Sequence, residues 1–133
     1  MKLLNRNTDY AIRAVSYMAG SRDKLVSVPE LVKTLKIPKP FLRKILQILN
    51  REGVAKSYKG IGGGFKLVRP AEKIYVMDII NIFQGHLKLN ECFLNKDLCP
   101  NRTKCPLKKR IEKIERFVVS EVGRITIKDL IGK

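Results

Sequence analysis

Residues 37–70 read IPKPFLRKILQILNREGVAKSYKGIGGGFKLVRP, and this stretch sets the predicted fold class. The apolar residues in its first half recur at helical spacing and predict a helix over residues 39–52 that stops at Gly53. The predicted buried stripe of this helix is Leu42, Ile45, Leu46 and Leu49. The remaining faces carry basic side chains, so the helix is predicted to pack on one side and to stay accessible on the other.

The second half of the stretch predicts a β-hairpin. Short strands are expected over residues 54–58 and 65–68, and the glycine-rich segment 59–64 between them permits positive φ angles and a tight reversal. A nucleotide-binding phosphate loop is not expected, because the Gly-Lys-Ser/Thr ending is missing. An ordinary hairpin turn without a ligand is the alternative interpretation of the glycine run.

Two helices are predicted before this stretch. The first spans residues 8–20 with Thr8 as its cap. Its predicted inward face consists of Ile12, Val15 and Ala19. The second begins at the capping box Ser27-Val28-Pro29-Glu30. Its predicted inward residues are Leu31, Val32 and Leu35. Helix, helix, turn, helix, strand, glycine-rich turn and strand is the order of a winged helix-turn-helix.

A winged helix-turn-helix binds DNA by placing its third helix in the major groove, where the first side chains meet base edges. Arg43 and Gln47 carry suitable donors and acceptors for bases, whereas Lys39 and Lys44 are predicted phosphate contacts. A glycine-flanked wing tip can approach the minor groove or the backbone closely. The candidate DNA-binding residues are Ser27, Lys39, Pro40, Phe41, Arg43, Lys44, Gln47, Tyr58, Lys59 and Ile61. Ser27 has a plain helix cap as its alternative role.

The charge of the chain favours such a partner. Among 133 residues, 28 Lys and Arg face 12 Asp and Glu, a formal net charge of +16. An excess of this size predicts a polyanionic partner and salt-dependent binding. An inert basic surface or a membrane-surface protein is the alternative. No secretory signal and no stretch of bilayer-spanning length is found, so a cytoplasmic protein without a membrane partner is expected.

The C-terminal part is predicted to contain a helix over residues 76–83, a loop, and a long helix over residues 107–122. The apolar stripe of the long helix is Leu107, Ile111, Ile114, Val118 and Val122. We interpret this stripe as a surface that pairs with its copy in a dimer, with packing on its own core as the alternative. A second capping pattern, Thr126-Ile127-Lys128-Asp129, starts a short final helix.

The predicted fold is therefore mainly α with a small β-wing. Three parts are expected: a winged helix-turn-helix DNA-binding domain over residues 1–85, a cysteine loop over residues 86–106, and a dimerisation helix with a short helix over residues 107–133.

All three cysteines of the chain, Cys92, Cys99 and Cys105, lie in that loop. Their spacings differ from the paired Cys-x2-Cys knuckles of structural zinc, and wider gaps suit a multi-atom cluster. Nearby lysine and arginine residues favour the thiolate form. His86 could complete a Cys3His zinc site, although an ordinary helix-end residue is its alternative role. An inert or disulfide-forming trio is expected less in a reducing compartment. No base or orienting group accompanies the thiols, so an enzyme is not expected.

Several motifs together resemble the IscR/NsrR-type (Rrf2) family of bacterial winged-helix iron–sulfur regulators. The resemblance covers nearly the whole chain. It rests on DYAIRA at residues 9–14, on residues 37–53, on GGGFKLVRP at residues 62–70, on the three cysteines, and on ITIKDL at residues 125–130.

The resemblance implies a homodimer on a palindromic double-stranded DNA operator and a [2Fe–2S] or [4Fe–4S] cluster on the three cysteines. In the nitric-oxide-sensing branch an acidic residue at the position of Asp9 supplies a fourth ligand from the partner subunit. Charge complementing the helix dipole is the alternative role of Asp9. The cluster-biogenesis branch uses a histidine where Lys108 stands. The first cysteine gap is also one residue longer than the commonest family pattern.

The function expected from these patterns is a DNA-binding transcription regulator, acting as a repressor. An iron–sulfur cluster that senses nitric oxide, redox state or iron–sulfur status would control its operator affinity. The alternative is a winged-helix regulator with structural zinc and no cluster-based sensing. Control of cysteine synthesis, a role of some cluster-free relatives, fits the cysteine trio poorly.

Overall fold

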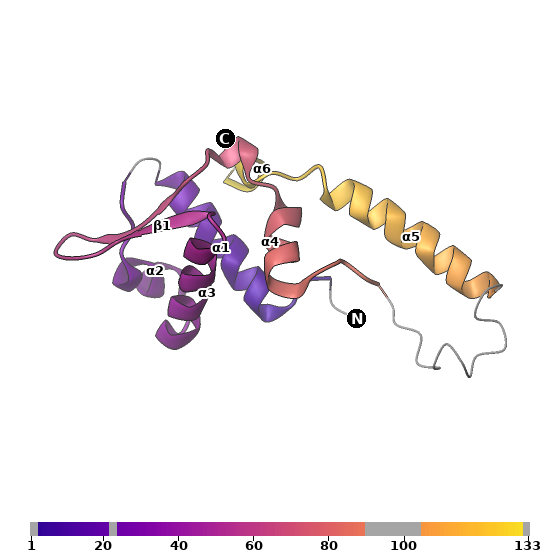
Figure 1. Ribbon diagram of the computed structural model, residues 1–133, viewed down its shortest axis with the longest axis horizontal. Helices are drawn as coiled ribbons and strands as arrows, with labels where there is room; N and C mark the ends of the chain where they lie inside the picture. Colours follow the sequence, from indigo (N-terminus) through magenta and orange to yellow (C-terminus); the bar gives the residue numbers. More distant parts are fainter. Residues whose placement is uncertain (1–2, 22–23, 90–104, 132–133) are drawn as a thin grey trace.

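Six α-helices and one two-stranded sheet make up the described part of the chain, residues 3–21, 24–89 and 105–131 of a computed structural model. In chain order they are α1 (Arg6–Gly20), α2 (Val28–Leu35), α3 (Lys39–Arg51), β1 (Ala55–Tyr58), β2 (Gly64–Leu67), the 3-10 turn η1 (Ala71–Lys73), α4 (Val76–Gln84), α5 (Pro106–Val122) and α6 (Ile127–Ile131). Figure 1 shows α2, α3 and the hairpin at one end of the molecule and α5 projecting from the other. The predicted mainly helical fold with a small β-wing is confirmed.

The buried face of α1 differs from the predicted one. Its fully buried apolar residues are Ala11, Ala14, Val15 and Met18, whereas Ile12 and Ala19 are half-buried. The prediction is confirmed for Val15, and Ile12 and Ala19 pack against the edge of the core. The other buried residues were missed because α1 lies centrally and contacts α3, α4 and α6, and its two alanines permit close approach of these neighbours. The predicted buried stripe of α3 is confirmed, since Leu42, Ile45, Leu46 and Leu49 are at most 2% exposed.

The start of α1 also differs from the prediction. Asn5, not Thr8, is the N-cap, and its side chain accepts a 2.8 Å hydrogen bond from the Thr8 backbone N–H. Thr8 is fully buried, and its hydroxyl donates a 2.7 Å hydrogen bond to Gln84 Oε1 at the end of α4. The helix therefore begins two residues earlier than predicted, and Thr8 joins two helices instead of capping one.

The helix-turn-helix follows the predicted local chemistry. The Ser27 side chain caps α2 by accepting a 3.2 Å hydrogen bond from the Glu30 N–H. Of the residues predicted to face inward, Leu31 is fully buried and Val32 and Leu35 are half-buried. The turn to α3 uses Lys36, whose backbone is left-handed with φ 56°, and Ile37, which is 2% exposed. These residues fix the angle at which α3 leaves α2.

The hairpin pairs in antiparallel register from Ala55 opposite Leu67 to Tyr58 opposite Gly64. On the edge of β2 that does not face β1, Val26 pairs with Phe65 through two backbone hydrogen bonds of 2.9 and 2.8 Å. This short bridge holds the base of the wing against the segment that leads into α2. The strand bounds lie within one residue of the predicted ones.

The glycine run serves two different needs. Gly60 and Gly62 have positive φ angles of 98° and 78°, as the predicted reversal requires. Gly63 and Gly64 do not; an added Cβ would lie 2.2 Å from the Tyr58 carbonyl oxygen at Gly63 and 2.4 Å from the Val26 carbonyl oxygen at Gly64. The last two glycines are therefore required by close backbone approach.

After α5 the chain packs against the N-terminal part of the molecule, beside α1, η1 and the start of α4. The Val76 N–H donates to the Ile125 carbonyl at 3.0 Å, and the Ile127 N–H donates to the Ile74 carbonyl at 2.8 Å. Thr126 and Asp129 bond each other's backbone N–H groups, which is the predicted capping pattern of the final helix. Ile127 is fully buried, so α6 belongs to the packing around α1 and η1.

Candidate nucleic-acid interface and cysteine site

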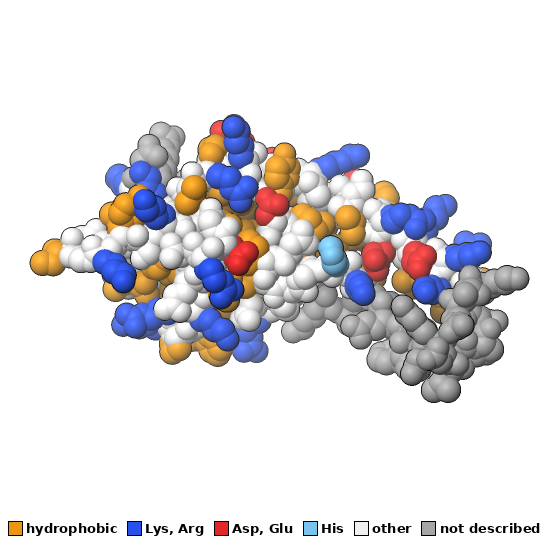
Figure 2. Space-filling model, viewed as in Figure 1, with side chains coloured by type: hydrophobic (Ala, Val, Ile, Leu, Met, Phe, Trp, Pro, Cys, Tyr) orange, Lys and Arg blue, Asp and Glu red, His pale blue; other side chains and the backbone are white. Residues whose placement is uncertain are grey.

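The accessible face of α3 gathers six of the candidate DNA-binding residues. They are all exposed: Lys39, Pro40, Phe41, Arg43, Lys44 and Gln47. The buried leucine and isoleucine stripe fixes this face outward, because rotating α3 would expose the core. Figure 2 shows Lys and Arg side chains spread over the body and along α5, with few acidic side chains among them. The face can therefore approach a polyanion without close carboxylate repulsion.

The hairpin brings together the other candidate residues. Tyr58 ends β1, and Lys59 and Ile61 belong to the tip. All three are exposed. The Lys56 ammonium lies 5.5 Å from the centroid of the Tyr58 ring, close enough for a cation–π contact. The wing therefore combines positive charge with an aromatic and an apolar side chain.

Ser27 has the helix-cap role, because its hydroxyl oxygen accepts the Glu30 N–H. The hydroxyl hydrogen is still a donor that a phosphate oxygen could accept. The geometry is compatible with both roles that the sequence left open.

Two hydrogen bonds that the sequence did not predict hold the elements of this face in place. The Tyr17 hydroxyl on α1 donates to Glu30 on α2 at 2.6 Å, and this bond raises the pKa of Tyr17 because it favours the protonated phenol. Asn50 at the end of α3 accepts the Ser57 N–H of β1 at 3.1 Å. These bonds join α1 to α2 and α3 to the wing. Neither pair has a local sequence signal, because the partners are 13 and 7 residues apart.

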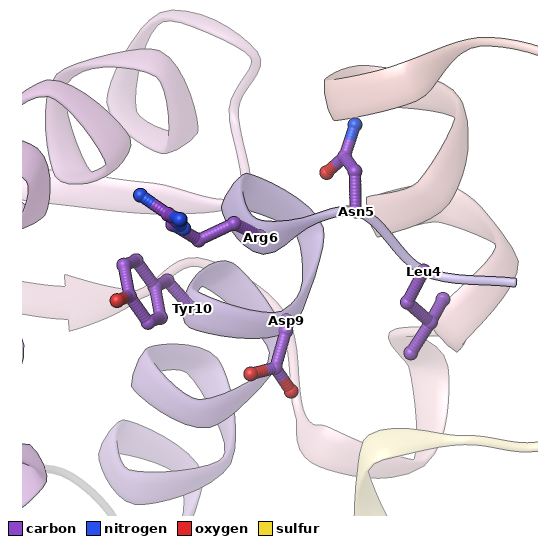
Figure 3. Close-up of a pocket in the computed structure, with 5 residues that line it drawn as sticks. All are labelled: Leu4, Asn5, Arg6, Asp9 and Tyr10. Carbon is purple, nitrogen blue, oxygen red and sulfur yellow. The ribbon is translucent and has the colours of Figure 1, made fainter. Parts of the chain in front are cut away.

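Asp9 lies in the first turn of α1. Its carboxylate forms a 3.1 Å ion pair with Arg13, one helical turn later, and both side chains are largely exposed. It also lines an open depression of about 380 Å³ together with Leu4, Asn5, Arg6 and Tyr10. Figure 3 shows the Asp9 carboxylate pointing away from the side chains of Arg6 and Tyr10. The carboxylate is thus accessible to a ligand, and binding one would break the surface ion pair with Arg13.

Cys105 is the one predicted cysteine ligand within the described residues, and Cys92 and Cys99 lie outside them. Cys105 is half-buried at the N-cap of α5, and its carbonyl accepts the Lys109 N–H at 3.2 Å. Cysteine sulfur is a suitable donor for a metal ion or an iron–sulfur cluster, so this residue fits either group. His86 is exposed just after α4. Over residues 3–21, 24–89 and 105–131, no group of three His, Cys, Asp or Glu side chains is placed to hold a metal ion.

Asp9 and Cys105 belong to different helices, since Asp9 lies in the first turn of α1 and Cys105 is the N-cap of α5. Figure 1 shows the start of α5 at the far tip of the projecting helix, well away from α1. A site that contains both residues would need two chains.

Comparison with known proteins identifies the family. The Rrf2 family model, described as an iron-dependent transcriptional regulator, matches residues 4–133. The chain belongs to the Rrf2 family. It is 38% identical over 125 residues to an Aquifex aeolicus (strain VF5) protein whose name places it among HTH-type transcriptional regulators, covering 92% of this chain and 87% of that protein. It is 29% identical to the HTH-type transcriptional regulator NsrR of Bacillus subtilis (strain 168), covering 98% and 90%.

Two solved structures, of CymR and of IscR, have a similar fold. CymR of B. subtilis, the global cysteine regulator, superposes with a TM-score of 0.82 at 22% identity, covering 98% of this chain and 97% of that one. T. potens IscR superposes with a TM-score of 0.76 at 23% identity, covering 98% and 86%. The predicted resemblance to the IscR/NsrR-type family is confirmed, and this Rrf2 protein is a DNA-binding transcription regulator, not an enzyme. Among the described residues, no helix has the length and apolar character to cross a membrane.

Proposed function

We propose that this Rrf2 protein is a cytoplasmic repressor whose operator affinity depends on an iron–sulfur cluster held by Cys92, Cys99 and Cys105. The observation that carries the proposal is the position of Cys105, which is the N-cap residue of α5. A bound cluster supplies iron chemistry that reacts with nitric oxide or oxygen and that depends on iron supply. Any change in the ligation of Cys105 therefore acts directly on the start of α5.

The apolar surface of α5 supports a homodimer. Leu107, Ile114 and Phe117 are 66%, 52% and 66% exposed in the single chain. Helical spacing places Leu107 and Ile114 on one stripe, and such a stripe is the usual seam between paired helices. We infer that α5 packs against a second copy of this chain. A two-fold dimer would place two copies of α3 on a palindromic operator.

The dimer also gives Asp9 a role. Because Asp9 and the start of α5 lie far apart in one chain, a second copy would have to bring them together. The exposed Asp9 carboxylate would then leave Arg13 and become the fourth cluster ligand of the partner's site. A single exposed ion pair is worth at most about 1 kcal/mol, so releasing it costs little.

Backbone contacts give the cluster site a route to the DNA-binding face. The Leu89 N–H, which lies in the cysteine loop before the first cysteine, donates to Glu115 on α5 at 3.2 Å. After the other end of α5, Ile125 bonds to Val76, the first residue of α4, and Ile127 bonds to Ile74, which precedes α4. A shift of α5 would therefore move α4. Because α4 packs against α1 and α1 packs against α3, the shift would also reach α3. We infer that cluster loss lowers operator affinity through this route.

Two cluster-free functions compete with this proposal. Structural zinc on the cysteines would keep the fold without sensing. The fold similarity to CymR, whose name is the global cysteine regulator, favours a second possibility, a regulator that needs no metal. The metal content of protein purified without oxygen separates all three.

The test is purification of the full chain under anaerobic conditions, followed by visible absorption and counting of iron, sulfide and zinc per chain. The proposal expects a coloured protein with iron and sulfide. It also expects Cys105→Ser to lose the colour and Asp9→Ala to lose it faster in air, whereas the exposed control Glu72→Ala retains it. Colourless protein with one zinc per chain would instead establish the zinc function.

A gel-shift titration then tests control of DNA binding. Operator duplexes are first selected from a random library with the cluster-loaded protein. Cluster-free protein should bind the selected duplex about tenfold or more weakly, in the range of known allosteric couplings. Equal affinity of the two forms would reject the sensing half of the proposal and leave a plain operator-binding regulator.

A further inference from the structure

The tip of the wing is a single exposed apolar side chain. Ile61 lies between Gly60 and Gly62, both with positive φ, and its side chain is fully exposed. Single exposed apolar residues are common on protein surfaces. Ile61 differs because it is the outermost residue of a hairpin in a DNA-binding domain, with no bulky neighbour on either side. Its side chain can therefore reach into a narrow space.

The strands that lead to this tip place two positive charges close together, and bound DNA would reduce their repulsion. Lys56 and Lys66 stand directly opposite each other in the antiparallel register, so both ammonium groups lie on the same face of the hairpin. Like charges opposite each other destabilise a strand pair. Tyr58 lies two residues after Lys56 and shares that face, and Lys59 follows it. A phosphate backbone against this face would offset the repulsion and direct the tip into the adjacent groove.

The chemistry of the tip distinguishes between base pairs. The minor-groove floor of A·T pairs presents acceptors alone, whereas a G·C pair adds the guanine N2 amine, a donor. Ile61 offers that amine no acceptor, and its bulk would displace the water bonded to it. Narrow A·T segments also have a more negative potential, which attracts lysine. An apolar tip with cationic flanks therefore suits A·T pairs.

We propose that Ile61 enters the minor groove and makes operator affinity depend on the absence of a guanine N2 amine there. The site read by Ile61 lies about half a helical turn, roughly five base pairs, from the major-groove contacts of α3, because the two grooves alternate along one face of DNA. This inference rests on the DNA binding of the proposed function. It does not depend on the cluster.

Modified bases test the proposal without changing the major groove. Inosine is guanine without the N2 amine, and 2,6-diaminopurine is adenine with it. Four duplexes carry A·T, G·C, inosine·C or diaminopurine·T at the wing position of the selected operator. The wild type should bind the A·T and inosine duplexes about tenfold more tightly than the other two, the size of one mismatched base pair.

Ile61→Ser should bind all four duplexes alike while still preferring the operator over random DNA. The Ile61 side chain is fully exposed, so this variant should fold normally. Val68→Ser is the matched control, because Val68 is also exposed and apolar but lies beyond the end of β2, away from the tip. It should keep the tenfold preference.

Equal binding of the four duplexes by the wild type, or an unchanged preference in Ile61→Ser, would overturn the inference and leave operator binding in place. A preference that follows the major-groove edge, with G·C and inosine·C alike, would overturn it too. Failure to select any operator would remove the proposed function itself, which makes the two failures distinguishable.

Discussion

Gly64 shows how strongly one missing side chain controls the wing. Its own backbone angle is unexceptional, but a Cβ there would meet the Val26 carbonyl oxygen at 2.4 Å. We expect Gly64→Ala to separate Val26 from Phe65 and to lose both of their hydrogen bonds. At about 1 kcal/mol each, the free energy of unfolding should fall by about 2 kcal/mol.

Urea unfolding of the cluster-free protein, with the protein concentration held constant across variants, measures this loss. Gly62→Ala is the comparison, because Gly62 has a positive φ but open space around it. That substitution should cost only about 1 kcal/mol, the usual penalty of a left-handed alanine. A larger cost at Gly62 than at Gly64 would contradict the close-approach explanation.

Gln84, at the end of α4, holds the start of the chain and α1 in place through side-chain hydrogen bonds. Its amide oxygen accepts the hydroxyl of the fully buried Thr8, and its amide nitrogen donates to the Leu3 carbonyl. Gln84→Leu would leave the Thr8 hydroxyl buried without a partner. We expect a loss of about 1–3 kcal/mol in the free energy of unfolding. Asn81→Leu on the exposed side of α4 should change it by less than about 0.5 kcal/mol.

The double substitution Thr8→Val with Gln84→Leu provides the decisive comparison. Removing both polar partners should recover much of the loss, because an unpaired buried hydroxyl costs more than an absent hydrogen bond. Strictly additive losses from the two single changes would show that Thr8 and Gln84 do not act as a pair.

At the element scale, α5 is the helix whose surface the single chain leaves uncovered. Ile114 is 52% exposed near the middle of its apolar stripe, so an acidic residue there should not harm the fold of the chain. In a dimer, the same change would bury a carboxylate in the seam between two helices, which is strongly unfavourable. We therefore expect Ile114→Asp to be a monomer that binds the operator weakly.

Sedimentation velocity of wild type and variant measures the change in assembly. Ser120→Asp adds the same charge six residues later, about 120° around α5 from Ile114 and outside the predicted apolar stripe, and should remain a dimer. If Ile114→Asp sedimented as a dimer, the apolar stripe of α5 would not be the interface.

The elements themselves were largely predictable from sequence, since local signals define them. The period of leucine and isoleucine predicted α3, Ser27 and Thr126 predicted caps that the structure contains, and the glycine run predicted the hairpin. The prediction for α1 held for Val15 but missed Ala11, Ala14 and Met18, because α1 is surrounded on several sides. In that setting, alanine, a weak hydrophobic signal, marks the closest contacts.

The candidate site was predictable only in part for the same reason. The exposed residues of α3 follow directly from its helical period, so their placement agrees with the sequence. The bonds from Tyr17 to Glu30, from Thr8 to Gln84 and from Val26 to Phe65 join distant segments, and no local pattern encodes them. The arrangement of Cys92 and Cys99 remains a prediction, because they lie outside the described residues.

The net charge of +16 can attract DNA in two ways, as a general field around the molecule or through contacts of one basic face. Figure 1 shows α3 at the lower edge of the body and α6 at the upper edge. Lys39 and Lys44 belong to α3, whereas Lys73 and Lys128 belong to η1 and α6, and all four are exposed. Two pairs of equal charge are thus available on different faces.

We expect the Lys39→Gln, Lys44→Gln variant to reduce the slope of log affinity against log salt concentration by about two, one for each lost phosphate contact. The Lys73→Gln, Lys128→Gln variant lowers the net charge equally but should leave the slope unchanged. Fluorescence anisotropy with the selected operator between about 50 and 200 mM salt gives both slopes. Equal reductions would mean that total charge, not the α3 face, drives binding. An unchanged slope in the α3 variant would place the DNA on another surface, because each phosphate contact necessarily releases counterions when it forms.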